Sequence, residues 1–264
     1  MMDNPARRQL LKFLAASPLL YCTAAGRLLA EESLDAIELP DYLIKSPADA
    51  LDVFDFHAVA KHTLPPAHYG YLATGTDGNE TLSANRRAFE QVYLRPMRMV
   101  DTSRISLETT LLGESLQSPI ALAPVGSQGA FHPDAELATA RAARAQGHLQ
   151  LLSNVATTPI EDVIAARGEP VWFQFYPTNQ WSTAQMMLER AERAGARVVV
   201  LTVDLNSGSN RVLLGQHERS DDRDCTVCHG TGSVEDFLRM NPIYEGPRPT
   251  YADFATPDTN WAYL

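Results

Sequence analysis

The chain has 264 residues, of which 45% are hydrophobic, and 22 basic against 32 acidic side chains give a formal net charge of −10. This size and apolar content suffice for a packed core, and length alone allows one or two domains. The acidic balance argues against a nucleic-acid partner, because phosphate recognition needs a basic patch. No apolar run reaches the length of about 20 residues that a membrane-spanning helix needs, so we expect no transmembrane segment.

The N-terminal residues 1–30 are similar to an export signal. Arg7 and Arg8 precede an apolar stretch over residues 13–21, which is followed by small residues. This order is typical of twin-arginine signals, which carry folded and often cofactor-loaded proteins. The alternative is a cytosolic protein with a basic amphipathic start. We expect a periplasmic or otherwise exported protein, in which residues 31–53 form an acidic linker or extended arm.

Short amphipathic segments and a hairpin pattern precede the first buried strand. Helices are predicted over residues 54–62, 65–74 and 80–89. The stretch 97–116 alternates threonine with isoleucine and leucine around Gly113, which predicts a β-hairpin. We expect this hairpin to lie under the sheet formed by the strands that follow.

Strands and helices then alternate. Short apolar runs predict strands, and the segments between them predict helices; the strands are 119–125, 149–154, 171–177 and 197–204, and the helices 135–146, 159–167 and 182–194. Asp134 and Thr158 are expected to cap two helix starts, and Gly147 and Gly195 to end two helices. The alternation favours a parallel sheet, either a barrel or a doubly wound sheet.

The spacing of these units suits a (β/α)8 barrel, which closes only with eight such units. The predicted fold class is therefore α/β, a partial TIM barrel of about four βα units with an N-terminal helical segment. The chain reads as the front half of an enzyme.

Motifs spread over residues 54–215 occur in the order of a known family; they include Tyr69-Gly70-Tyr71-Leu72-Ala73, Leu94-Arg95-Pro96, Ala121-Leu122-Ala123-Pro124-Val125-Gly126, Phe173-Gln174-Phe175-Tyr176 and Leu201-Thr202-Val203-Asp204. Together they resemble the FMN-dependent α-hydroxy acid dehydrogenase/oxidase family, which includes glycolate oxidase, lactate oxidase, L-lactate dehydrogenase and flavocytochrome b2. Residues 54–215 would then be the N-terminal half of that family's barrel.

The resemblance implies FMN as the cofactor. It places backbone against the flavin ring after the first strand and neutral polar side chains at the ends of the next three; these cofactor-binding candidates are Pro124, Val125, Gly126, Ser153, Gln174 and Thr202. A glycine permits a close approach, and hydroxyl or amide groups can hydrogen-bond the flavin's polar edge without adding charge. Taken singly, each polar residue could be an ordinary strand-end cap.

The resemblance also implies a small L-2-hydroxy acid, lactate-like, oxidised to the 2-oxo acid. Tyr71, Tyr176 and Arg211 would bind it, because a guanidinium meets a carboxylate with two charge-assisted hydrogen bonds. Asp204 matches the aspartate that orients and charges the family's catalytic histidine. Val155 stands where the family often carries a bulky aromatic residue, and the smaller valine would admit a larger substrate.

The catalytic base is not found. After Asp204 no segment resembles a strand bearing the family's histidine, its fifth-strand lysine or its second arginine, and we expect a truncated portion that lacks base and phosphate-binding loops. The isolated chain is then expected to be inactive. Two other readings are a non-catalytic remnant or electron-transfer module, whose open sheet edges pair with another chain in a homo-oligomer, and a different FMN-binding barrel enzyme. The electron acceptor is not indicated.

The tail, residues 216–264, is predicted to be irregular. Cys225, Cys228 and His229 form a CxxCH pattern, which is the attachment sequence of c-type haem. The alternatives are a local disulfide or unpaired thiols, and a metal site that includes His217.

Overall fold

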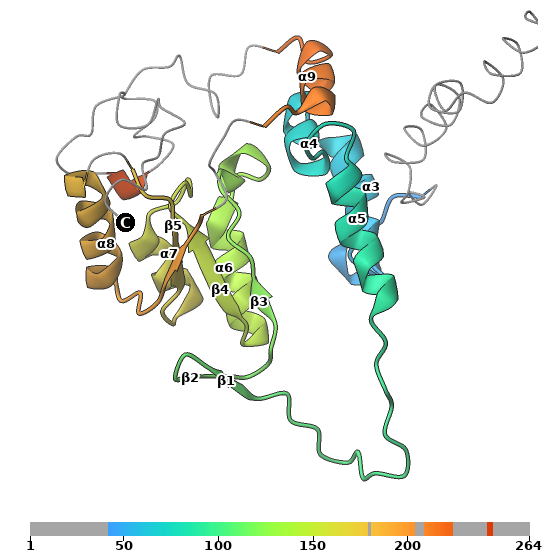
Figure 1. Ribbon diagram of the computed structural model, residues 1–264, viewed down its shortest axis with the longest axis vertical. Coiled ribbons are helices and arrows are strands. Elements are labelled where there is room, and N and C mark those ends of the chain that lie inside the picture. The colour runs from blue at the N-terminus through green and yellow to red at the C-terminus, as the bar shows by residue number, and fades with distance from the viewer. Residues whose placement is uncertain (1–41, 179–180, 204–208, 224–241, 245–264) are drawn as a thin grey trace, which may run out of the picture. The chain divides into compact units, whose positions relative to one another are not determined.

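The computed structural model describes residues 42–178, 181–203, 209–223 and 242–244, which belong to two compact units (Figure 1). Unit 1 comprises Met1–Pro96 with Ser209–Asp222, and unit 2 comprises Met97–Gly208 with Arg223–Leu264. The expected export signal lies outside the described residues. Within the described part, no helix has the length and apolar content to cross a membrane.

Unit 1 is helical. Its elements are η1 (Pro47–Asp49), α3 (Asp55–Thr63), α4 (Pro66–Ala73), α5 (Glu80–Ala88), η2 (Phe89–Gln91) and α9 (Val212–Arg219). The three helices predicted before residue 90 are confirmed within two residues at each end. Helix α9 packs on α4 so closely that a Cβ atom at Gly70 would lie 2.7 Å from the Cβ of His217. The expectation of an irregular tail from residue 216 therefore does not hold for residues 216–219.

Unit 2 begins with the predicted hairpin. Strand β1 (Thr109–Leu111) pairs antiparallel with β2 (Glu114–Leu116). The two turn residues Leu112 and Gly113 have φ values of 50° and 82°, as a type I′ turn requires. The indole Nε1 of Trp172, at the start of a sheet strand, donates a hydrogen bond of 2.8 Å to Glu114 Oε2. This bond ties the hairpin to the amino-terminal end of the sheet.

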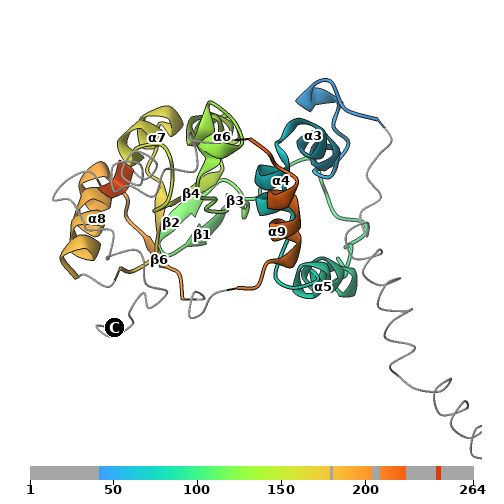
Figure 2. The ribbon, with the colours of Figure 1, turned by 90° about the horizontal axis from the view of Figure 1, so that it is seen from above.

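The sheet of unit 2 contains the four predicted strands as β3 (Ala121–Leu122), β4 (Leu149–Ser153), β5 (Trp172–Phe175) and β6 (Val199–Leu201). All pairings are parallel and the order is β3-β4-β5-β6. The intervening helices α6 (Ala135–Gln146), α7 (Ile160–Arg167) and α8 (Trp181–Ala194) lie on one side of it (Figure 2). Sequential order with helices on one face is the arrangement of a barrel and excludes the doubly wound alternative. Among the described residues this barrel is open.

The core of unit 2 lies between the sheet and these helices. Phe173 is completely buried, and it packs with Val163 of α7 and Met187 of α8. A late segment joins this core, because Ile243 in η4 (Pro242–Tyr244) is 5% exposed and belongs to the same cluster. Arg190 of α8 fastens it by donating to the carbonyl oxygen of Pro242.

The helix-end signals are partly right. Gly147 and Gly195 have φ values of 64° and 107°, which confirms them as left-handed residues after α6 and α8. Neither Asp134 nor Thr158 makes a capping hydrogen bond: Asp134 forms an ion pair with Arg141 instead. Pro159 occupies the N-cap position of helix α7. Its ring fixes φ, which is −54° here, and its ψ of 140° is that of an extended backbone.

Candidate cofactor and substrate site

Three polar side chains form a continuous row across the carboxyl ends of β4, β5 and β6. Ser153 Oγ donates to Gln174 Oε1 at 2.9 Å, and Gln174 Nε2 donates to Thr202 Oγ1 at 2.6 Å. Ser153 and Gln174 are each 4% exposed. An amide has two donor and two acceptor positions, and the row uses one of each on Gln174. The remaining proton and lone pair can serve a ligand.

Pro124, Val125 and Gly126 follow β3 at the same end of the sheet. A Cβ atom at Gly126 would lie 2.5 Å from Val155 Cγ2 and 3.7 Å from Ser153 Oγ. The glycine is therefore required by the approach of Val155, whatever else the loop contacts. Because Ser153 Oγ is also within reach, the loop after β3 adjoins the polar row.

Two further predicted residues lie beside these loops. The carbonyl oxygen of Val125 accepts a hydrogen bond of 3.3 Å from Gln128 Nε2, and the Val125 side chain is exposed. Tyr176 follows β5 directly and is partly buried. Six cofactor candidates and Tyr176 thus belong to one end of one sheet.

Tyr71 and Arg211 are paired in unit 1. The guanidinium carbon of Arg211 lies 5.1 Å from the ring centroid of Tyr71, and Nη2 donates to the Tyr71 carbonyl oxygen at 2.7 Å. The same nitrogen donates to the carbonyl oxygen of Thr74. These acceptors are at the carboxyl end of α4, where a cation is favourable. Arg211 therefore fastens the residue before α9 to α4 and holds Tyr71 beside it.

The predicted site residues are thus described in two groups, one in each unit. Asp204, expected to orient the base, lies outside the described residues, as do Cys225, Cys228 and His229 of the CxxCH pattern. In the described part of the chain, no cluster of histidine, cysteine and carboxylate side chains forms a metal site.

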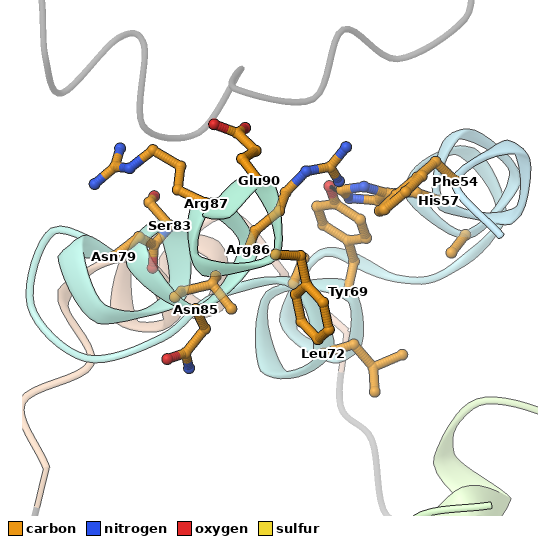
Figure 3. Close-up of a pocket in the computed structure, with 14 residues that line it drawn as sticks. Phe54, His57, Tyr69, Leu72, Asn79, Ser83, Asn85, Arg86, Arg87 and Glu90 are labelled. Atoms are coloured by element: carbon orange, nitrogen blue, oxygen red, sulfur yellow. Dashed lines mark hydrogen bonds between the residues drawn. The ribbon is translucent and has the colours of Figure 1, made fainter. Parts of the chain in front are cut away.

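Unit 1 also contains an open groove of about 740 Å³ between α3, α4 and α5 that the sequence did not indicate (Figure 3). Its walls are mainly apolar, and Figure 3 shows Tyr69 directed toward His57. The Tyr69 hydroxyl lies 2.8 Å from His57 Nε2. Burial, with Lys61 and Arg86 nearby, lowers the pKa of His57. The neutral imidazole is therefore favoured, and its Nε2 can accept a hydrogen bond from the Tyr69 hydroxyl.

The sequence also missed the role of a buried carboxylate, Glu136. It is completely buried and accepts hydrogen bonds from residues after β3 and after β4. One signal was available, because Glu136 is the only acidic residue in the segment that forms α6. A carboxylate in the first turn of a helix is stabilised by the positive end of the helix dipole.

Comparisons with known proteins agree with this geometry. A sequence model described as FMN-dependent dehydrogenase matches residues 60–225. Glycolate oxidase 1 of Zea mays is 40% identical over 153 residues, which cover 58% of this chain and 42% of that enzyme. Glycolate oxidase of Spinacia oleracea is 39% identical over the same number of residues. The chain thus spans less than half the length of these relatives.

Solved structures give the same result. A crystal structure of mandelate oxidase superposes with a TM-score of 0.60 at 31% identity, covering 64% of this chain and 49% of that one. Mandelate oxidase with benzoyl-formic acid superposes with a TM-score of 0.61 at 31% identity, over 64% of this chain and 50% of that one. The fold is a partial (β/α)8 barrel of the flavoenzyme class. The chain belongs to the FMN-dependent dehydrogenase family.

The residues present fit the cofactor that defines this family. The polar edge of a flavin carries neutral hydrogen-bond donors and acceptors. The side chains of Ser153, Gln174 and Thr202 are also neutral donors and acceptors, and they lie at the carboxyl end of the sheet, where the active sites of barrels form. Gln174 retains both a donor and an acceptor for such a partner. Ser153, Gln174 and Thr202 are therefore the residues that would hold the ring's edge.

Proposed function

We propose that the chain forms part of an FMN-dependent oxidoreductase that oxidises a small L-2-hydroxy acid, lactate-like, to the 2-oxo acid. The observation that carries this proposal is the hydrogen-bonded row of Ser153, Gln174 and Thr202 at three consecutive strand ends. FMN, when bound, supplies the acceptor for the two electrons that leave the substrate. The chain's own residues bind the cofactor and the substrate and orient them relative to each other.

The roles of these residues follow from their chemistry. Gln174 meets the cofactor's edge with its remaining amide proton and lone pair, while Ser153 and Thr202 fix the plane of the amide from both sides. Arg211 and Tyr71 present a cation and a phenol that suit a carboxylate. Asp204 would orient and charge the base, and Tyr176 would add a hydroxyl to the substrate site.

The names of the similar proteins support the substrate class. Glycolate and mandelate are both 2-hydroxy acids, and benzoyl-formic acid is a 2-oxo acid. Val155, which packs against Gly126, lies beside the polar row, so the size of this side chain would influence what fits there. We expect Val155→Trp in a protein carrying the rest of the barrel to lower turnover of bulky 2-hydroxy acids relative to lactate. Equal turnover of both would contradict that role.

The first experiment is a visible absorption spectrum of the purified 264-residue chain after incubation with FMN and removal of free cofactor. Retained flavin bands, lost in Gln174→Leu, would support the proposal. A colourless wild-type chain would mean that these residues do not suffice to hold FMN. A Soret band in the same spectrum would show haem attached at Cys225 and Cys228.

Activity is a separate matter, because no candidate for the base was identified. We expect the chain alone to show no turnover of L-lactate with a dye acceptor even where FMN is retained. Turnover would overturn this expectation and require His229 to be reconsidered.

A non-catalytic module is the second candidate, and one observation favours it. The side chains of Val199 and Leu201 on β6 are 50% and 39% exposed, so this strand offers an apolar face to another chain. A colourless chain that forms stable oligomers would favour this function over the first.

We also propose export through the twin-arginine pathway. The support is the sequence Arg7-Arg8 before an apolar stretch. Replacing both arginines with lysine should retain the protein in the cytoplasm in a fractionation experiment. Export of the double variant at the wild-type level would refute the proposal.

A further inference from the structure

The buried carboxylate of Glu136, in the first turn of α6, accepts four hydrogen bonds from described residues of unit 2. Its side chain is 0% exposed. Oε1 accepts from the backbone N–H groups of Gln128 at 3.2 Å and Thr157 at 3.0 Å, and Oε2 accepts from the hydroxyls of Thr157 at 2.9 Å and Thr158 at 2.7 Å. All four donors are neutral groups.

A buried carboxylate is costly unless hydrogen bonds compensate for its lost hydration. Here two backbone and two hydroxyl donors do so, helped by the positive end of the α6 dipole. Bonds to an ionised acceptor are stronger than neutral ones. The arrangement therefore holds its donors in place firmly, whereas a neutral side chain of the same shape would hold them less firmly.

The donors come from two different loops. Gln128 lies in η3 (Gln128–Ala130), after β3, whereas Thr157 and Thr158 follow β4. Two more bonds join the same loops: Ser127 N–H donates to the Val155 carbonyl oxygen at 2.9 Å, and Gly129 N–H donates to Thr157 Oγ1 at 3.0 Å. Glu136 is the only charged member of this network.

These two loops are the ones that carry the cofactor candidates. Gly126 lies two residues before Gln128, and Ser153 and Val155 precede Thr157 by four and two residues. The contact between Gly126 and Val155 is already tight, so a shift of either loop changes the space beside the polar row. Because Glu136 belongs to α6 and accepts hydrogen bonds from both loops, this helix sets the spacing between them.

We propose that Glu136 is a positioning residue for the cofactor, which fixes the loop after β3 against the loop after β4 through its charge. This inference rests on the proposed function, since the cofactor is the group that the loops would contact. Glu136 itself touches neither cofactor nor substrate. Its effect passes through Gln128, Thr157 and Thr158.

The test uses Glu136→Gln, which keeps the shape and removes the charge, and Thr158→Val, which removes one donor. Thr158→Ser restores the hydroxyl. The matched control is Glu161→Gln on α7, where a partly exposed carboxylate pairs with Arg190 at 2.9 Å. FMN affinity is measured by quenching of flavin fluorescence, together with the visible circular dichroism of the bound flavin and the thermal midpoint of each variant.

We expect Glu136→Gln to weaken FMN binding by about tenfold or more and to change the circular dichroism at saturation, because charged hydrogen bonds are lost. Thr158→Val should weaken binding by a smaller factor, and Thr158→Ser and Glu161→Gln should resemble the wild type. A Glu136→Gln variant with a lower thermal midpoint but unchanged affinity and dichroism would overturn the inference, because its role would then be structural only.

A second readout does not depend on FMN. In the apo chain, Glu136→Gln should accelerate amide hydrogen exchange at Gln128 and at Thr157 together, with little change in α8. Acceleration in one loop alone would refute the coupling. If the wild type fails to bind FMN while both loops respond, the residues of this chain do not suffice to hold the cofactor, and the coupling of the two loops by Glu136 stands.

Discussion

Gly126 shows how a single missing Cβ atom can position a loop. Its φ is not in the left-handed region, so the reason for glycine is the neighbouring side chain rather than the backbone angle. Val155 occupies the place that a Cβ atom would need. The loop after β3 can therefore approach the end of β4 more closely than any other residue would permit.

Gly126→Ala is expected to destabilise unit 2 by about 1–3 kcal/mol, the usual range for overpacking a filled site. Because the obstacle is Val155 Cγ2, the double variant Gly126→Ala/Val155→Ala should regain part of that loss. Urea unfolding of the single and double variants measures both effects. A single variant as stable as the wild type would contradict the tight contact.

A second prediction concerns the pH dependence of stability and rests on His57. Because the pKa of His57 is lowered in the folded state, relative to about 6.5 when unfolded, the unfolded chain binds its proton first as pH falls. The contribution of His57 to the stability of the fold is therefore fully present above about pH 6.5, and it is lost as the pH falls from there through the lower pKa of the folded state. An NMR titration of His57 should give a midpoint below 6.5, and His57→Gln should reduce the loss of stability in acid. A midpoint at or above 6.5 would refute the burial effect.

At the scale of elements, the β1–β2 hairpin depends on its turn. Gly113 has a φ of 82°, and no atom lies within 4 Å of the place that a Cβ atom would take, so only its backbone conformation requires glycine. This is the opposite of Gly126, where space is the reason. The two glycines should therefore respond differently to the same substitutions.

Gly113→Ala is expected to cost roughly 1 kcal/mol, because alanine disfavours the left-handed region. Gly113→Asn should cost less, since asparagine tolerates that region. Urea midpoints of the two variants test the order. Equal losses would show that something other than φ decides this position.

The order and type of the elements could be predicted because each depends on local periodicity. The helices at 135–146 and 182–194 and all four strands were found, although the strands are shorter than predicted because apolar runs continue beyond the paired residues. Helix α9 was missed, since its stability comes from packing on α4, which is far away in sequence.

The site was predictable to a different degree. Ser153, Gln174 and Thr202 could be selected as strand-end polar residues, and the structure joins them by hydrogen bonds. The network around Glu136 could not be selected, because its donors lie 8 to 22 positions away along the chain. Thr158 was expected to cap a helix, yet its hydroxyl bonds to Glu136 instead. Such choices depend on which partner is nearest in space.

At the scale of the whole molecule, β6 is the outer strand of the sheet among the described residues, and one of its faces is exposed. Val199, Leu201 and Val203 are 50%, 39% and 61% exposed and recur at every second position, so they point to one side of β6. A parallel edge with such a face can accept a further strand and its helix. We propose that a second copy of the chain can occupy it.

Sedimentation of the chain should then show species heavier than the 29.0 kDa protomer. Leu201→Lys should shift the population toward that mass, because a buried lysine at the new contact would be costly. Leu43→Lys, which alters a similarly exposed leucine of unit 1, is the control. A monomer at all concentrations, or an equal effect of both variants, would contradict this occupant.

Ile243 has a consequence for the order of events during synthesis. The core that it completes is otherwise built from residues between 140 and 196, so its last side chain leaves the ribosome about 50 residues later than its neighbours. Contacts of such high sequence separation close slowly, because the intervening chain must first be gathered in. Nascent unit 2 can therefore collapse early and yet reach its final packing only after translation has passed Ile243 and this residue has left the ribosome.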